Sequence, residues 1–409
     1  MKFHKLQVRL CFAIGLLSAV LPITAQTWTQ TSAPSYRWIC VACSSDGSKL
    51  MVSGASWIYC VSTNAGSTWT TNYQPQKGSA FVSWGAMATS ADGTKLVCTT
   101  WNNLWVSTNS GITWLSNNVP GVDVFISVAL SADGNKLVAV AGGNHLGPIF
   151  TSTNSGVNLT QTMVPTNNWW SVISSADGTK LAATAINSQG GVIYTSTNSG
   201  VSWVLAGAPT NNSWRTIASS ADGSKLVAAS EQAYISGHIY GCVYTSTNFG
   251  TTWISNNVPD AQWESVASSV DGTKLIAVAI SPKGLIYSST NSGATWISNT
   301  VPEEYWIAAA LSADGNKQVA FANADQSFKP GHIITSQTMP APCLNLTSSS
   351  NNNSISWIIP STNFMLQQSS DLTAWADVTN VPVLNLTNLQ NQITLPSSNA
   401  SGFYRLKTP

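Results

Sequence analysis

Four acidic side chains are the best candidates in this chain for acid–base chemistry. Asp260 and Glu264 lie close together in the sequence, and Glu303 and Glu304 are adjacent one repeat later. Hydrolysis of a glycosidic bond needs two carboxyl groups that flank the bond. If these residues meet at one site, the protein is a polysaccharide-active glycoside hydrolase. The other interpretation is that they are solvated loop acids, as most exposed carboxylates are.

Other catalytic chemistry has less support. The repeat region contains His145, His238 and His332, but no nucleophile-elbow motif accompanies them. No Cys, His, Asp and Glu residues are spaced like the ligands of a metal site, and we expect neither a metal nor a cofactor. Cys40 and Cys43 lie in a predicted strand without a nearby His, so a redox or metal motif is not expected there.

Two short phrases alternate along the chain and define its repeat. The first, Ser-Ala-Asp-Gly-x-Lys-Leu with small variations, has its Asp at Asp46, Asp92, Asp133, Asp177, Asp222, Asp271 and Asp314. The mean spacing is about 45 residues, which is the blade period of β-propellers. Asp-Gly between two alternating apolar runs is a strong β-hairpin signal.

The second phrase, Ser-Thr-Asn-x-Gly, predicts another hairpin. Its six copies are Ser62–Trp69, Ser107–Trp114, Ser152–Leu159, Ser196–Trp203, Ser246–Trp253 and Ser289–Trp296. The Asn oxygen can accept backbone N–H groups across a tight bend, Gly adopts a positive φ, and the Trp enters the core on the returning strand. Two hairpins give four strands a repeat, and seven such units suit closure into a ring. The sequence therefore predicts an all-β fold, with a seven-bladed β-propeller over residues 26–340.

The second phrase resembles the Asp-box, or BNR, repeat of sialidase-like β-propellers, with Asn at the Asp position. The resemblance covers roughly residues 26–340 and implies the fold rather than the activity, because the family's boxes lie away from its active sites. Sialidases hold the substrate carboxylate with three arginines, since a guanidinium matches a carboxylate. The predicted propeller contains only Arg37 and Arg215. We therefore expect a sialidase-like fold without the sialidase active site.

An aromatic residue begins each repeat, eight positions before the turn Asp. These residues are Trp38, Trp84, Phe125, Trp169, Trp214, Trp263 and Trp306. By resemblance to propellers, they begin the innermost strands, near the central channel and opposite the Asn phrases. They wedge between blades, or form an aromatic collar able to stack on sugars, and both can hold at once. Trp57, Trp101 and Trp170 extend this candidate ligand-binding surface into the neighbouring loops.

Residues 1–25 have the pattern of a secretory signal peptide. Lys2, Lys5 and Arg9 precede the apolar run Leu10–Leu21, and Ile23-Thr24-Ala25 is a plausible cleavage site. The apolar run is too short to span a bilayer. We therefore expect a secreted or cell-surface protein.

The two ends of the predicted propeller complement each other. Gln26–Thr31 matches the strand that follows each Asn phrase, although it precedes the first repeat, and the seventh repeat lacks that strand. We predict that this N-terminal segment closes the last blade and so removes an exposed sheet edge. Residues 346–409 follow a linker and carry a different alternating pattern, which predicts a small β-sandwich. They resemble C-terminal modules of secreted bacterial proteins.

Charge excludes some partners. Only 8% of the residues are charged and the net charge is +1, so no field attracts nucleic acid or anionic lipid. We expect a monomeric, non-catalytic binding or scaffold propeller that contacts a glycan or protein ligand through aromatic loops at the channel mouth. The alternative is the glycoside hydrolase described above.

Overall fold

The computed structural model describes most of the two predicted β-rich regions. The described residues are 28–55, 58–73, 85–119, 121–142, 145–187, 190–235, 238–323, 331–337, 344–348, 352–358, 365–369, 374–379, 382–385, 390–396 and 403–407. All regular elements within these ranges are β-strands. The predicted signal peptide lies outside the described residues, and so do Trp57 and Trp84.

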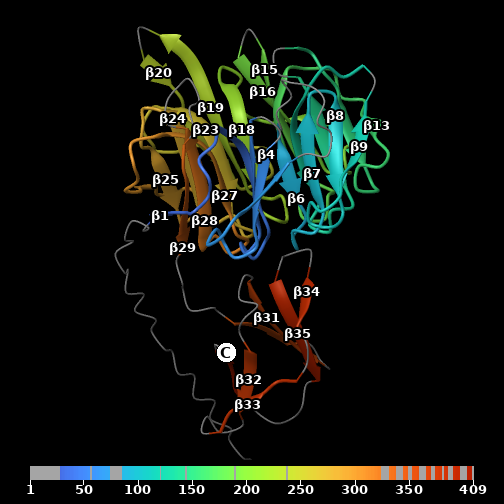
Figure 1. Cartoon of the computed structure of the whole chain (residues 1–409), viewed down its shortest axis with the longest axis vertical. Coiled ribbons are helices and arrows are strands. Elements are labelled where there is room, and N and C mark those ends of the chain that lie inside the picture. The colour runs from blue at the N-terminus through green and yellow to red at the C-terminus, as the bar shows by residue number, and fades with distance from the viewer. Residues whose placement is uncertain are drawn as a thin grey trace, which may run out of the picture.

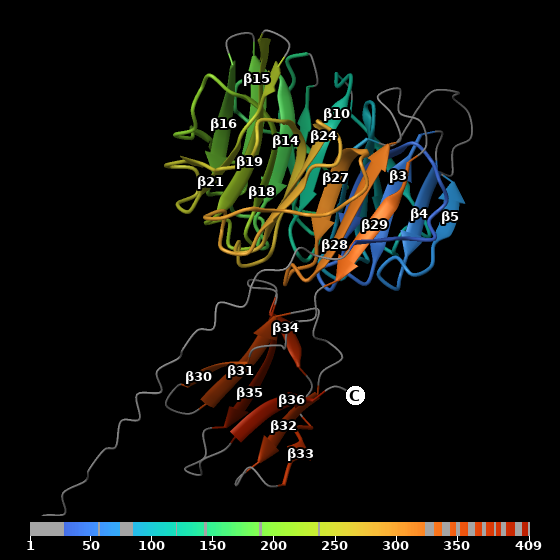
Figure 2. The same cartoon turned by 90° about the vertical axis from the view of Figure 1, so that its left-hand side faces the viewer.

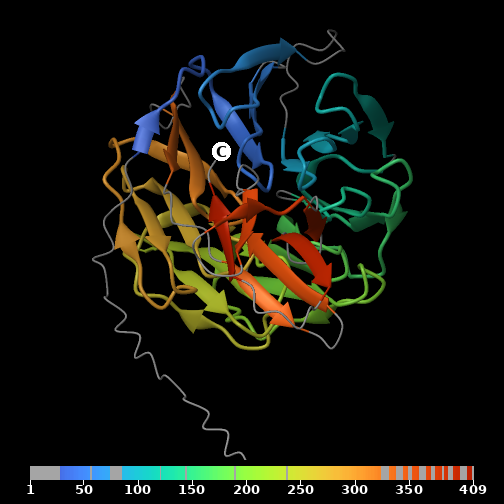
Figure 3. The same cartoon turned by 90° about the horizontal axis from the view of Figure 1, so that it is seen from below.

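Seven antiparallel sheets form a ring around a central channel, as the repeat predicted. Figure 1 shows the sheets from the side, and Figure 3 shows their circular arrangement from below. In blades 1 to 6 the chain runs outward from the innermost strand. The inner-to-outer strands of blades 1 to 3 are β2 (Trp38–Cys43), β3 (Leu50–Gly54), β4 (Ile58–Ser62) and β5 (Thr70–Tyr73); β6 (Met87–Thr89), β7 (Leu96–Thr100), β8 (Asn103–Ser107) and β9 (Leu115–Asn118); and β10 (Phe125–Leu130), β11 (Leu137–Ala141), β12 (Ile149–Ser152) and β13 (Thr160–Gln161).

Blades 4 to 6 follow the same order, and blade 5 has an additional strand. Their strands are β14 (Trp169–Ser174), β15 (Leu181–Asn187), β16 (Gly190–Ser196) and β17 (Val204–Leu205); β18 (Ser213–Ser219), β19 (Leu226–Ile235), β21 (Val243–Ser246) and β22 (Ile254–Ser255), with β20 (His238–Tyr240) paired to β19; and β23 (Gln262–Ser268), β24 (Leu275–Ser281), β25 (Ile286–Ser289) and β26 (Ile297–Ser298).

The N-terminal strand closes blade 7, as predicted. This blade contains β27 (Tyr305–Leu311), β28 (Lys317–Asn323), β29 (Ile333–Gln337) and, outermost, β1 (Trp28–Gln30). β1 pairs antiparallel with β29, with Trp28 opposite Ser336, and the Thr31 N–H donates to the Ile333 carbonyl at 2.9 Å. The first and last strands of the ring therefore share one sheet.

We call the seven Ser-x-Asp-Gly hairpins the Asp turns. In the first, Gly47 has φ 65°, and the Asp46 carboxylate accepts hydrogen bonds from the Ser44 hydroxyl at 2.6 Å and the Ser48 N–H at 3.0 Å. The Ser44 hydroxyl also accepts the Lys49 N–H at 3.0 Å, which closes the bend from its other side. The repeated acids thus serve the turns in which they lie.

Backbone hydrogen bonds between successive Asp turns join the seven blades in a closed circle. Ser45 N–H donates to the Ala91 carbonyl at 2.8 Å, and Ala313 N–H returns to the Ser45 carbonyl at 2.7 Å. The members, in donor order, are Ser45, Ala91, Ala132, Ala176, Ala221, Val270 and Ala313. Lysines add links between blades: the Lys225 ammonium donates to the Asp271 carbonyl at 2.9 Å, and Lys317 to that of Asp46 at 3.0 Å.

We call the six Ser-Thr-Asn-x-Gly bends the Asn turns. Asn64 Oδ1 accepts the Thr68 N–H, while Asn64 Nδ2 donates to the Thr68 hydroxyl, both at 2.9 Å. The amide therefore both accepts from and donates to Thr68. Both Ala65 (φ 55°) and Gly66 (φ 87°) adopt positive φ, whereas the sequence assigned it to the Gly alone. Ala65 N–H donates to the Ser48 carbonyl, so both turn types lie at one end of the blade.

The C-terminal module consists of two packed sheets (Figure 2). The first has the order β30 (Asn345–Ser348), β31 (Asn352–Ile358), β35 (Gln390–Pro396) and β34 (Val383–Asn385); the second has β33 (Ala376–Asp377), β32 (Met365–Ser369) and β36 (Phe403–Lys407). Trp357 and Ile393 of one sheet form a buried cluster with Leu366 of the other. This arrangement is the predicted small β-sandwich.

Two truncated chains test closure by the N-terminal strand. A chain that begins at Ser32 lacks β1 and should melt about 5 °C or more below a control chain that begins at Trp28. The reason is the loss of several backbone hydrogen bonds, each worth about 1 kcal/mol, together with the half-buried Trp28 side chain. Thermal unfolding followed by circular dichroism measures the difference. Equal transitions would contradict closure by β1.

The Asp turns predict a loss of stability in acid. Burial alone would raise the pKa of these carboxyls, but hydrogen bonds from Ser and from the turn N–H, with the neighbouring blade's Lys, outweigh it and lower the pKa. The affected residues are Asp46, Asp92, Asp133, Asp177, Asp222 and Asp271. A lowered folded-state pKa adds stability above the unfolded pKa of about 3.9, and this stability is lost as the pH falls through the folded values.

The melting temperature should therefore change little from neutral pH down to about pH 5 and fall steeply below about pH 4. Calorimetry across this range tests the expectation, and Asp271→Asn should make the acid decline shallower because one titrating group is removed. A melting temperature that stays level into strong acid would overturn this account of the turns.

Candidate functional site

The channel opens into a cavity of about 450 Å³ at the end of the blades opposite the turns. Its wall includes the residue that follows the first aromatic position of each repeat, so every blade contributes one side chain or glycine. These residues are Ile39, Gly85, Ile126, Trp170, Arg215, Glu264 and Ile307, and Trp101 joins them from a loop. We call this set the channel mouth. Its polar groups are concentrated in neighbouring blades 4, 5 and 6.

The aromatic residues that begin the inner strands pack between blades. Trp169, Trp214, Trp263 and Trp306 are 0% exposed, Trp38 is 1% exposed, and Phe125 is 2% exposed. Trp38, for example, packs against Val319 and Phe321 of blade 7. The residue after each of these aromatics is skipped in the pairing with the second strand, as Ile39 is between Trp38 and Cys40, and such a β-bulge directs its side chain to the channel. Of the two roles considered for these residues, the structure shows the wedge between blades; the aromatic collar is wrong, because none of these six rings presents a face to a ligand.

Trp101 differs from the wedges because 61% of its side chain is exposed. It lies in the tight turn between β7 and β8 of blade 2 and lines the channel mouth. Its carbonyl accepts the Phe125 N–H at 2.7 Å, which ties the turn to blade 3. In a ring of seven, blade 2 lies across the channel from blades 5 and 6. An exposed indole on an anchored turn is suited to stacking.

Three side chains of the mouth interact across blade boundaries. The Arg215 guanidinium carbon lies 4.7 Å from the centre of the Trp170 ring, a cation–π contact. Arg215 Nη2 lies 3.5 Å from Glu264 Oε2. The side chains of Arg215 and Glu264 are 18% and 28% exposed, so both are largely enclosed yet reach the solvent in the channel. This arrangement places an aromatic ring, a hydrogen-bond donor and an acceptor at one site.

The four candidate catalytic acids do not all line this mouth. Glu264 lines it, and no second carboxylate does so among the residues that the structure describes. Glu304 Oε1 instead lies 2.8 Å from His332 Nδ1. Asp260 and Glu303 are exposed, ahead of the inner strands of blades 6 and 7. The geometry gives Glu264 a basic partner rather than an acidic one.

Arg215 is the site residue that the sequence analysis did not select. In the sequence, Arg215 enters only in the count of arginines, which are too few for a sialidase site. Its position directly after Trp214 is the signal that could have identified it, because the residue after the wedged aromatic is bulged out of the pairing and lines the channel. The same reasoning distinguishes Trp170, which was selected, from the buried Trp169 beside it.

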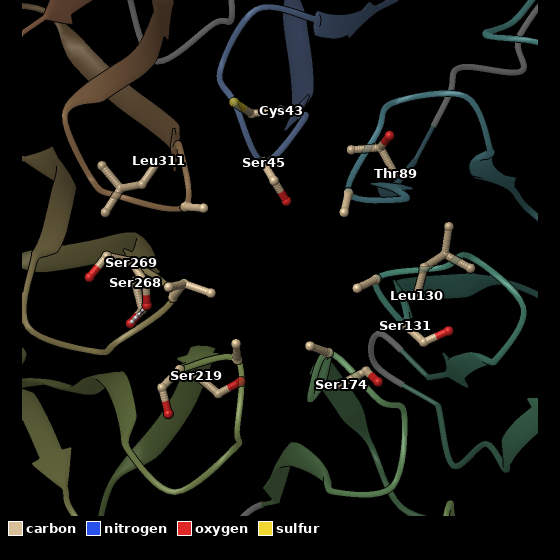
Figure 4. Close-up of a pocket in the computed structure, with 17 residues that line it drawn as sticks. Cys43, Ser45, Thr89, Leu130, Ser131, Ser174, Ser219, Ser268, Ser269 and Leu311 are labelled. Atoms are coloured by element: carbon tan, nitrogen blue, oxygen red, sulfur yellow. Dashed lines mark hydrogen bonds between the residues drawn. The ribbon is translucent and has the colours of Figure 1, made fainter. Parts of the chain in front are cut away.

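Uncharged side chains line the turn end of the channel among the described residues (Figure 4). A cavity of about 200 Å³ there is lined by residues that include Cys43, Thr89, Leu130, Ser174, Ser219, Ser268 and Leu311. Several hydroxyls bond to the adjacent backbone, as Ser268 does to the Ser269 carbonyl at 3.0 Å. Burial raises the pKa of the Cys43 thiol to about 12 and keeps it protonated, so it is a poor nucleophile.

Two further kinds of site were sought within the same ranges. In the part of the chain that the structure describes, no three His, Cys, Asp or Glu side chains are grouped as metal ligands would be. No helix in that part has the length and apolar character needed to cross a bilayer.

Comparisons with known proteins identify the architecture. No family model and no curated protein matches the sequence. YCF48 bound to a D1 peptide is similar, with a TM-score of 0.56 and 12% identity over 78% of this chain and 99% of that one. Hydrazine synthase of Kuenenia stuttgartiensis has a TM-score of 0.58 and 14% identity, over 76% of this chain and 98% of that one. At these identities the similarity shows a shared propeller fold.

A glycoside hydrolase has a similar structure as well. The GH74 xyloglucanase of Xanthomonas campestris gives a TM-score of 0.58 and 13% identity over 81% of this chain. This chain spans 59% of the xyloglucanase chain, so part of that enzyme has no counterpart in the alignment. The propeller fold is thus compatible with different activities, and the site residues must decide among them.

A double-mutant cycle tests the Arg215–Glu264 pair. Arg215→Met, Glu264→Met and the double variant should give a coupling free energy of about 1 kcal/mol in urea unfolding, because each single change leaves an enclosed charge without this partner. The control cycle combines Arg215→Met with Glu304→Met, since Glu304 pairs with His332 instead. Coupling near zero in the first cycle would show that the two charges do not interact in solution.

Proposed function

We propose that this protein is an exported, non-catalytic binding propeller that holds a glycan or protein ligand at the channel mouth. The observation that carries the proposal is the meeting of exposed Trp101 with the Trp170–Arg215–Glu264 group around one cavity. A few convergent polar groups in a largely apolar cavity are typical of ligand sites. At the opposite end of the channel, hydroxyl side chains donate to neighbouring backbone carbonyls instead, as Ser268 does to Ser269.

The arrangement of the acids supports binding over hydrolysis. A glycosidase needs two carboxyl groups on either side of the scissile bond. Among the described residues, the mouth offers Glu264 alone, and that carboxylate is engaged with Arg215. The mouth is therefore better equipped to hold a ligand than to cleave one. Hydrolysis through Asp260, Glu264, Glu303 and Glu304 is the alternative that the test below must distinguish.

Two further parts of the proposal come from the sequence. The Asn turns are a variant of the Asp-box repeat in which the amide both accepts and donates a hydrogen bond, as Asn64 does with Thr68. The basic, apolar and small-residue segments of residues 1–25 direct export, and the low content of charged residues suits an extracytoplasmic β-protein. The protein then acts outside the cytoplasm, as a secreted or surface-attached binding module.

The test combines a binding screen with a turnover screen. The mature protein is applied to glycan and peptide arrays, and soluble hits are followed by calorimetry and by a reducing-end assay. We expect binding without cleavage, and Trp101→Ala should weaken it by about tenfold through loss of one stacking contact. Tyr73→Ala is the matched control, because Tyr73 is similarly exposed (57%) but lies on the outer strand β5.

Two results would overturn the proposal. One is cleavage of a polysaccharide that Glu264→Gln abolishes, which would make the mouth an active site. The other is binding that survives Trp101→Ala unchanged, which would place the ligand elsewhere on the protein.

A further inference from the structure

We infer that the ligand of the channel mouth is an uncharged sugar residue of a neutral polysaccharide, stacked on Trp101 and hydrogen-bonded by Arg215 and Glu264. This inference rests on the proposed function, since it names the chemical class of ligand for the same site. Three features of the mouth carry it: its balance of charge, its exposed aromatic ring and the isoleucine side chains in its wall.

The charges of the mouth cancel. Arg215 and Glu264 are the only two charged side chains that line it among the described residues, and they lie 3.5 Å apart. A carboxylate or sulfate drawn to Arg215 would approach the Glu264 carboxylate and be repelled, and an amine drawn to Glu264 would meet the guanidinium. A sugar hydroxyl avoids both penalties, since it can accept from a guanidinium and donate to a carboxylate. The pair therefore favours neutral hydroxyl groups over ionised ones.

The aromatic ring and the apolar wall suit the other surface of a sugar. A pyranose presents a face of C–H groups, which stacks on an indole, and a rim of hydroxyls. Trp101 is 61% exposed and projects from blade 2, while Arg215 and Glu264 lie in blades 5 and 6 across the ring. A sugar between them meets an apolar surface on one side and polar groups on the other. Ile39, Ile126 and Ile307 add apolar surface to the wall, and Ser171, Thr216 and Ser265 add hydroxyl groups.

The size of the cavity agrees with one or a few sugar residues. Its volume of about 450 Å³ falls within the range of small-ligand sites, roughly 300–1,000 Å³. The cavity is open at the end of the ring, and a polysaccharide chain can continue from it into solvent.

The experiment compares ligand classes on variants that change the charge of the mouth. The mature protein, Glu264→Gln, the double variant Arg215→Met with Glu264→Met, and the control Glu304→Gln are each titrated by calorimetry. The ligands are neutral gluco-, manno-, galacto- and xylo-oligosaccharides, the corresponding uronic-acid oligomers, an amino-sugar oligomer and a set of neutral and charged peptides. Thermal melts confirm that each variant is folded.

The expected result is specific. The wild-type protein binds at least one neutral oligosaccharide at least tenfold more tightly than its charged counterparts. The double variant loses that binding although its net charge at the mouth is still zero, because both hydrogen-bonding groups are gone. Glu264→Gln weakens neutral binding and gains affinity for uronic acids, since the Glu264 carboxylate no longer repels an anion that approaches Arg215. Glu304→Gln binds as the wild type does.

Other outcomes separate failure of the inference from failure of the proposed function. If a uronic acid, amino sugar or peptide binds best and the double variant abolishes it, the ligand class is wrong while the mouth remains a binding site. If no ligand class responds to the mouth variants, the proposed function and the inference both fail.

Discussion

The ring depends on hydrogen bonds between the Asp turns of adjacent blades. Each donor is a backbone N–H and each acceptor a backbone carbonyl, and the seventh bond returns to Ser45. Because the backbone alone makes these bonds, Ser, Ala and Val all occur at the equivalent positions. The lysine that follows each turn reinforces the contact in several blades, as Lys225 does at the Asp271 carbonyl. These backbone bonds keep the spacing of the blades regular at the turn end. The lining of the channel at its other end differs from blade to blade.

The mouth shows how such a scaffold acquires a site. In the six blades where this part of the chain is described, a large aromatic residue is buried between blades, and the next residue lies in a β-bulge that directs it to the channel. Three blades place isoleucine at that next position, whereas blades 4, 5 and 6 place Trp170, Arg215 and Glu264 there. The polar group is thus built from equivalent positions of neighbouring repeats. A small number of substitutions at scaffold positions can change what the channel binds.

The architecture could be predicted from the sequence because the turn motifs recur at a regular spacing. Seven Asp-Gly hairpins at a regular spacing require seven similar sheets, and the unmatched strand at Trp28 could only complete the last one. The site could be predicted only in part. Trp101, Trp170 and Glu264 were selected by residue type, but the burial of Trp38 and its equivalents depends on packing between blades, which the repeat does not specify. Arg215 is part of the site because it contacts Trp170 and Glu264, which belong to other repeats.

The pairing of β1 with β29 has a consequence for the order of assembly. Blades 1 to 6 are each formed from continuous stretches of chain, and their pairings can form as those stretches become available. Blade 7 needs Trp28 and Ser336, the two ends of the propeller, in the same sheet. Long-range contacts of this kind form late, because a large loop must close first. During synthesis from the N-terminus, the backbone groups of β1 would therefore lack their β29 partners until almost all of the propeller had been made.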